Sequence, residues 1–201
     1  MQPVAADKVS RRNVLKSLTM GAVAGSVLRA IPLEAAEYAH NVIEAERVNK
    51  STGYAPKFFK PHQYKTLRML CDTILPADAD SGGAVEAGAP EFIDLLTSEN
   101  PEFQVKLGGG LLWLDSNCGD RYGNVYLDST PQQQKEILDL IAYRANAETD
   151  QGLSQGVEFF SLLRNLASDG FFTSKIGIQY LGYIGNSFLT DFPGCPPVPG
   201  V

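Results

Sequence analysis

Apolar residues recur every three or four positions along much of the chain, which is the spacing of amphipathic helices. The clearest stripe lies within residues 62–75, and Pro76 ends the helix that it predicts. Similar stripes predict a short helix over about 90–97 and a last helix over about 155–166. Thr130 followed by Pro131 is typical of an N-cap and a first helical turn, so another helix begins there.

Two further segments are expected to be helical on composition. Residues 33–49 are rich in helix formers and follow a proline. A helix from Pro101 towards Arg121 contains the run Gly108–Gly110, and glycine disfavours a helix interior by about 1 kcal/mol relative to alanine. Either another backbone approaches this run closely, or the helix breaks there.

No stretch alternates with period two for long enough to demand a sheet. The predicted fold is therefore all-α, a compact bundle of about five or six helices around one core. The helical domain is expected to span residues 31–169, between a segment 1–30 and a tail 170–201 of different character. At 201 residues and 44% hydrophobic content, the chain suits one such domain.

Charge separates the first thirty residues from the rest. They carry five basic residues and one aspartate, a net charge of +4, whereas the whole chain is at −6, so the remainder carries −10. A body this acidic repels phosphate backbones, which makes nucleic acid an unsuitable partner. The basic segment therefore has the character of a targeting signal.

The sharpest motif is the pair Arg11-Arg12, preceded by Ser10 and followed by an apolar pair and Lys16. A mildly apolar stretch, residues 18–28, comes next and is too short to cross a bilayer. The arrangement resembles a twin-arginine (Tat) export signal, in which a receptor of the translocase recognises the arginine pair and the cargo is exported already folded. The alternative is an amphipathic helix with a chance arginine pair. The sequence leaves open whether the segment is cut near Ala30 or retained.

The tail, residues 170–201, combines many glycines and prolines with aromatic side chains and only two charges, Lys175 and Asp191. An irregular, aromatic-rich and charge-poor segment is typical of the core of a protein interface. The alternative is that the tail covers its own helices; a mixture has Phe171 and Phe172 in the chain's own core and the rest against a partner. The predicted partner-binding residues are Tyr180, Tyr183, Phe188, Phe192 and Cys195.

Catalytic motifs are missing from the sequence. The histidines, His40 and His62, have no motif around them, and no dinucleotide fingerprint or phosphate loop is present. We therefore predict no catalytic, cofactor-binding or metal-binding residues. Of the cysteines, Cys71 lies on an apolar helical stripe and is expected to be buried. Cys118 and Cys195 are the candidates for a disulfide, either with each other or with another chain.

Several of these segments together resemble the gluconate 2-dehydrogenase subunit 3 family. They are the twin-arginine leader, residues 70–76 (LCDTILP) with the small-residue loop after them, residues 87–94 (AGAPEFID), and three blocks of the tail, 170–174, 182–186 and 192–196. Each motif alone is weak, but their order covers nearly the full chain.

The resemblance implies a non-catalytic small subunit beside a large FAD-dependent subunit of the glucose-methanol-choline type. Such complexes oxidise gluconate, other sugars or the 3-hydroxyl of glycosides, and many pass electrons to a c-type cytochrome. The small subunit stabilises the flavin subunit and its leader carries that subunit to the periplasm, where the complex can associate with the membrane. The chain itself would bind no cofactor. Two alternatives are a stand-alone periplasmic helical binding protein and an enzyme with an unrecognised site.

Overall fold

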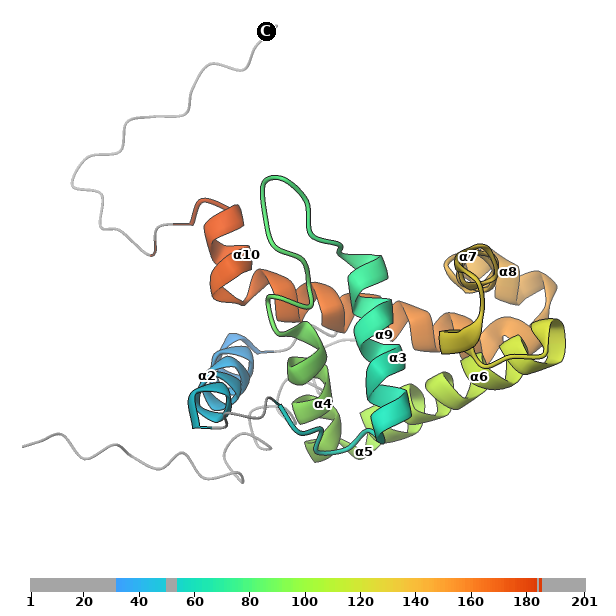
Figure 1. The fold of residues 1–201 in the computed structure, drawn as a ribbon, viewed down its shortest axis with the longest axis horizontal. Helices are drawn as coiled ribbons and strands as arrows, with labels where there is room; N and C mark the ends of the chain where they lie inside the picture. The colour runs from blue at the N-terminus through green and yellow to red at the C-terminus, as the bar shows by residue number, and fades with distance from the viewer. Residues whose placement is uncertain (1–31, 50–53, 184, 186–201) are drawn as a thin grey trace, which may run out of the picture.

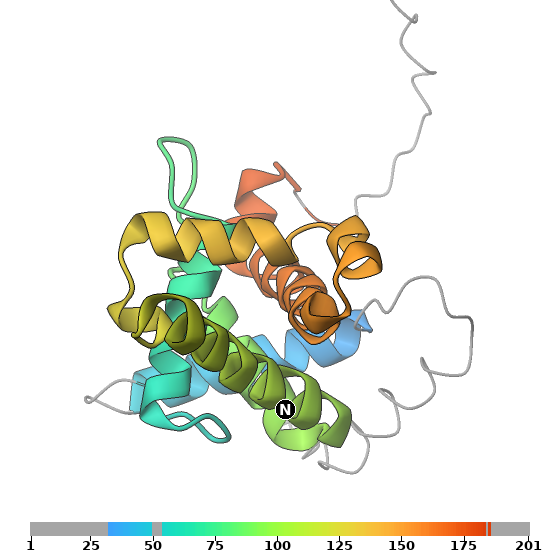
Figure 2. The ribbon, with the colours of Figure 1, turned by 90° about the vertical axis from the view of Figure 1, so that its right-hand side faces the viewer.

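The computed structural model describes residues 32–49, 54–183 and 185, and these form an all-α fold without strands. Long helix α9 (Ser154–Phe172) runs through the middle, and α4 (Ala89–Glu99) and α6 (Gly109–Tyr122) pack against it (Figure 1). Helix α3 (Pro61–Ile74) also crosses α9, while α7 (Pro131–Ile141) and α8 (Arg144–Thr149) cover one end. Figure 2 shows the same helices stacked around α9. The predicted fold class is confirmed.

Helix starts and stops follow the signals in the sequence. Helix α2 has the predicted bounds, Leu33–Asn49. At the start of α7, Thr130 Oγ1 accepts a hydrogen bond from the Gln133 amide, and the Gln133 side chain accepts one from the Thr130 amide. This reciprocal capping box satisfies two donors that a helix N-terminus leaves unpaired. Short 3₁₀ turns at Tyr126–Asp128 and Gln151–Leu153 lead into α7 and α9.

The glycine run does not break its helix. A short turn α5 (Pro101–Phe103) continues through a π-helical segment, Gln104–Gly108, directly into α6. A Cβ atom on Gly110 would lie 2.1 Å from Cγ of Phe159 on α9, so only glycine fits. The close approach that was one of the two predictions is confirmed, but a phenyl ring makes it instead of another backbone.

Buried Asp94 on α4 fixes the segment that leads into α3. Its carboxylate accepts hydrogen bonds from the Tyr54 hydroxyl (2.7 Å) and from the amides of Lys57 (2.6 Å), Phe58 (3.1 Å) and Phe59 (3.0 Å). A carboxylate without exposed surface is stable only with such partners. Asp94 therefore has a structural role, which accounts for the aspartate that ends the sequence AGAPEFID.

The prediction of irregular backbone from residue 170 onward is wrong for the first part of the tail. Helix α9 continues to Phe172, and Lys175–Tyr180 forms a further helix, α10. Gly170 permits this because a Cβ there would lie only 3.1 Å from Cα of Ala89 on α4. Close packing against α4 outweighs the low helix propensity of glycine.

Candidate functional site

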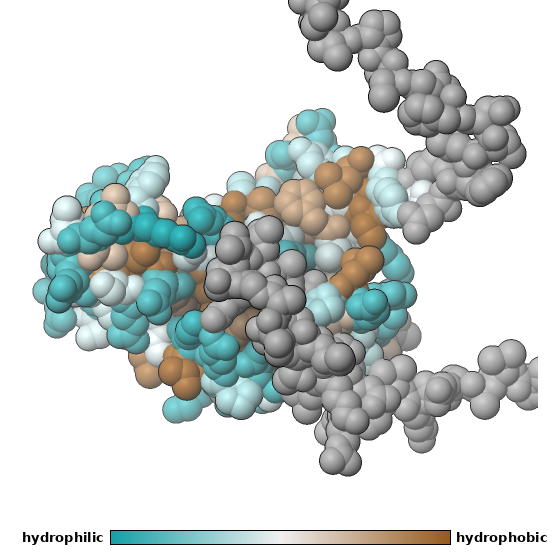
Figure 3. Space-filling view, turned by 180° about the vertical axis from the view of Figure 1, so that it is seen from behind, coloured by the Kyte–Doolittle hydropathy of each residue, from teal (hydrophilic) through white to brown (hydrophobic). Residues whose placement is uncertain are grey.

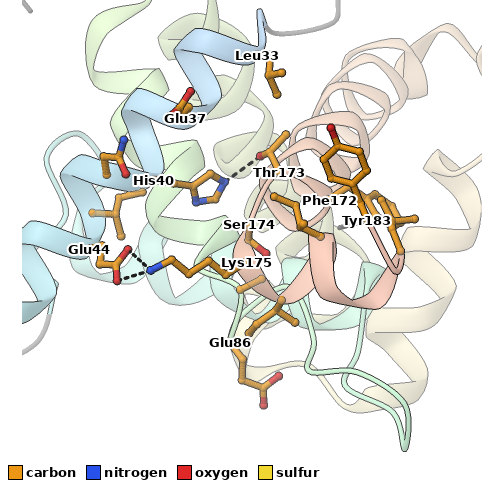
Figure 4. A pocket seen from close by; sticks show the side chains of 16 residues that line it. Leu33, Glu37, His40, Glu44, Glu86, Phe172, Thr173, Ser174, Lys175 and Tyr183 are labelled. Atoms are coloured by element: carbon orange, nitrogen blue, oxygen red, sulfur yellow. Dashed lines mark hydrogen bonds and ion pairs between the residues drawn. The ribbon is translucent and has the colours of Figure 1, made fainter. Parts of the chain in front are cut away.

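A groove of about 810 Å³ lies at the end of the molecule where α2 faces α10. Its walls come from α2, from the loop before α4, from the end of α9 and from α10 (Figure 4). Figure 3 shows hydrophobic side chains gathered at this end, on the right in that view. The apolar side chains in the wall are Leu33, Ile43, Ala87, Phe172, Ile176, Ile178 and Leu181. We call this feature the α2–α10 groove.

Helix α10 turns back from α9 through a tight corner at Thr173 and Ser174. Ser174 Oγ donates a hydrogen bond to the Phe171 carbonyl (2.7 Å) and accepts one from the Gly177 amide (3.1 Å). A Cβ on Gly177 would lie 2.1 Å from that same carbonyl oxygen. The sequence Thr-Ser-Lys-Ile-Gly thus supplies both the N-cap and the glycine that the corner requires.

Two polar contacts join the walls of the groove. His40 Nε2 lies 2.9 Å from Thr173 Oγ1, and the His40 ring stacks on Phe92 with centroids 5.2 Å apart. Because the Thr173 hydroxyl donates to the Asp169 carbonyl, it accepts from His40. On the other side of the groove, Lys175 Nζ lies 2.7 and 2.8 Å from the two carboxylate oxygens of Glu44. These contacts hold α2 beside α10.

The predicted partner-binding residues can be placed in part. Tyr180 and Tyr183 are 53% and 54% exposed, and Tyr183 lines the groove. Phe188, Phe192 and Cys195 lie outside the described residues, as do Arg11 and Arg12 of the predicted export signal. Phe171 is buried as predicted, but Phe172 is partly exposed and forms part of the groove wall instead of the core.

Cys71 and Cys118 lie within the described residues. Cys71 is buried as predicted, and burial raises the pKa of its thiol above the usual value. Cys118 lies on the inner face of α6, where it is fully buried. Burial raises the pKa of this thiol as well. Cys195 lies outside the described residues, so the pairing of Cys118 with Cys195 or with another chain stays a prediction.

Sequence reasoning missed the α2 wall of the groove. Leu33 and Glu37 entered only as part of a helix predicted from composition, and His40 was considered only as a catalytic candidate. Ile178 and Leu181 were not singled out. The two walls lie more than 130 residues apart in sequence, as the His40–Thr173 contact illustrates. One signal in the sequence could have indicated the groove. Leu33 and Leu181 are large apolar residues at helix ends, and both are exposed in the structure.

The groove offers binding surface but no evident chemistry. Among residues 32–49, 54–183 and 185, no cluster of three metal-ligating side chains occurs. His62, the other histidine, is at an exposed site outside the groove, 2.7 Å from Asp115 Oδ2. Within the part of the chain that the structure describes, no helix is long and apolar enough to cross a membrane.

Comparison with protein families decides the relationship. The family model described as gluconate 2-dehydrogenase subunit 3 matches residues 61–194, two thirds of the chain. The chain belongs to the gluconate 2-dehydrogenase subunit 3 family. The family's name implies one subunit of a multi-subunit gluconate dehydrogenase, which is consistent with an accessory role. Comparisons with curated proteins and with solved structures gave no match. The matched residues include the α9–α10 wall of the groove, whereas α2 precedes them.

Proposed function

We propose that this chain is the non-catalytic small subunit of a periplasmic, FAD-dependent sugar or glycoside dehydrogenase. In this role it stabilises the large flavin subunit and escorts it through twin-arginine export. The observation that carries the proposal is the match to the gluconate 2-dehydrogenase subunit 3 family over residues 61–194. The flavin belongs to the large subunit, and a c-type cytochrome subunit is a candidate electron acceptor for the complex.

Two features of the chain support an escort. The pair Arg11-Arg12 stands before an apolar stretch, the arrangement of a signal for folded cargo. The far end of the chain presents Tyr180, Leu181 and Tyr183 with more than half of each side chain exposed. Exposed aromatic residues of this kind are typical anchors of an interface.

Co-expression with the large flavin subunit tests both parts of the proposal. The two chains should purify together with a flavin absorption spectrum, while the small chain alone should show no sugar oxidation with an artificial acceptor. Replacing Arg11 and Arg12 together by lysine should leave active dehydrogenase in the cytoplasm. Lysine keeps the charge but lacks the planar, multi-donor guanidinium group.

Arg29→Lys is the matched control, since it makes the same change in the same segment outside the pair. It should leave export intact. If the flavin subunit reaches the periplasm in the double variant, it has its own route and the escort role is wrong. If the chain purifies alone and colourless even when co-expressed, the result favours the hypothesis of a stand-alone binding protein. Turnover by the isolated chain would point to an enzyme.

A further inference from the structure

The α2–α10 groove combines an apolar wall with an acidic rim. Among the described residues that line it, the carboxylates of Glu37, Glu44 and Glu86 face one lysine, Lys175 (Figure 4). The amine of Lys175 is already bound to both oxygens of Glu44. The groove therefore has an excess of negative charge beside its apolar surface.

Of the three carboxylates, Glu37 is the one best placed to meet a ligand. The Glu86 carboxylate accepts a hydrogen bond from the Gly83 amide of its own loop. Glu37 is exposed on α2, and no residue of the described ranges forms an ion pair with it. A cation arriving beside it gains Coulomb energy without having to displace a lysine or arginine of the described ranges.

The groove exposes several large apolar side chains to solvent. Leu181 is 59% exposed and Leu33 is 71% exposed, and Phe172 and Tyr183 lie beside them. Large exposed apolar patches with a polar rim mark interaction sites. A volume of about 810 Å³ can take several side chains from a partner segment.

We propose that the α2–α10 groove binds a segment of the large flavin subunit that carries apolar side chains and at least one lysine or arginine. The apolar side chains cover Phe172, Leu181 and the neighbouring wall, and the basic group pairs with Glu37. Charge complementarity favours a basic segment over an acidic one, which the rim would repel, and the proposed function supplies the partner. This inference rests on the proposed function, and it identifies where and by what chemistry the two subunits meet.

The test measures binding of the purified full chain to the large flavin subunit. Leu181→Asp and Glu37→Lys should each weaken the complex by about tenfold or more, since each removes one half of the proposed recognition. Two matched controls make the same changes away from the groove: Leu112→Asp on α6, where the side chain is 62% exposed, and Glu158→Lys on the exposed face of α9. Both should bind within about twofold of the wild type.

Two further measurements test the ion pair and the location of the contact separately. Raising the salt concentration should weaken the wild-type complex and change the Glu37→Lys complex less, because the ion pair is screened. Hydrogen exchange of α2 and α10 should slow in the complex compared with the isolated full chain.

Each other outcome overturns the proposal. If the groove variants bind like the wild type, the subunits meet elsewhere, and a loss in Leu112→Asp alone would place the contact on α6. If α2 and α10 are protected equally in the isolated chain and in the complex, the groove holds a segment of this chain itself, such as its leader. If the wild-type chain does not bind the flavin subunit at all, the proposed function fails first, and the two failures remain distinguishable.

Discussion

Large apolar side chains are buried near the start of α9, whereas several near its finish are exposed. Near its start, Phe159 fits over Gly110, and Gly156 leaves room for Trp113, whose ring atoms would lie 2.5 Å from a Cβ at that glycine. Near its finish, Phe171 is buried, but Phe172 is only partly covered and Leu181 and Tyr183 of the following segment are largely exposed. Within the described residues, side chains fill the space at one end of α9, and apolar surface is exposed at the other.

This difference separates stability from binding within one helix. Glycines at the start allow helices to approach until aromatic rings fill the space, which is how a close-packed core forms. At the finish, the chain turns a corner and presents its apolar side chains towards a groove that the described residues leave open. Changes at the start should therefore alter folding, whereas changes at the finish should alter association.

The largest effect is expected for Gly110→Ala at the filled end. Its new methyl group would overlap the Phe159 ring, so the free energy of unfolding should fall by about 3 kcal/mol in a denaturant titration. Gly119→Ala is the matched control, because it lies on the same helix with nothing within 4 Å of the added atom. The control should stabilise the protein by about 0.5–1 kcal/mol. Equal effects of the two changes would refute the packing argument.

At the open end, Tyr183→Ala should weaken binding to the partner and leave stability almost unchanged. Unfolding should change by less than about 0.5 kcal/mol, while binding to the flavin subunit should weaken by about 2 kcal/mol. Tyr143→Ala, at the opposite end of the molecule, removes a tyrosine that is 67% exposed and should alter neither quantity. If Tyr183→Ala lowers stability and leaves binding intact, the open end is part of the core after all.

The buried thiols of the core should make stability depend on alkaline pH. Because burial raises the pKa of Cys71 in the folded state, this contribution is fully present below the pKa of the unfolded thiol, about 8.5, and is lost as the pH rises above it. The slope should reach about 1.4 kcal/mol per pH unit for each such thiol. Urea titrations between about pH 8 and pH 10 measure it, and Cys71→Ala should show a smaller slope. If Cys71→Ala shows the same slope as the wild type, the pKa of the Cys71 thiol does not change on unfolding.

The smallest effect concerns the ion pair that joins the walls of the groove. Lys175→Met should cost less than about 1 kcal/mol of stability, because both Lys175 and Glu44 are exposed. Lys135→Met, which removes an exposed i,i+4 pair with Asp139 on α7, is the control and should behave similarly. A much larger loss for Lys175→Met would show that the groove depends on this contact for its shape.

Local signals in the sequence were sufficient for most helices. Helix α2 has its predicted bounds, and α3, α4, α7 and α9 begin within about one residue of the expected starts, because prolines, caps and apolar stripes act over a few residues. Short helices α8 and α10 were missed, since six residues are too few to show a helical period. The finish of α9 was placed six residues early, and the glycines and prolines of the tail were expected to prevent a long helix there.

The sequence by itself determined an all-helical fold and an aromatic, charge-poor C-terminal region, and it carried the motifs of the gluconate 2-dehydrogenase subunit 3 family. Only the tertiary structure decided that Cys118 faces the core, that Gly110 makes room for a ring, and that α2 and α10 face each other across a groove. Helical period and capping are local properties of the chain. Burial and the meeting of Glu44 with Lys175, by contrast, depend on which distant segments pack together.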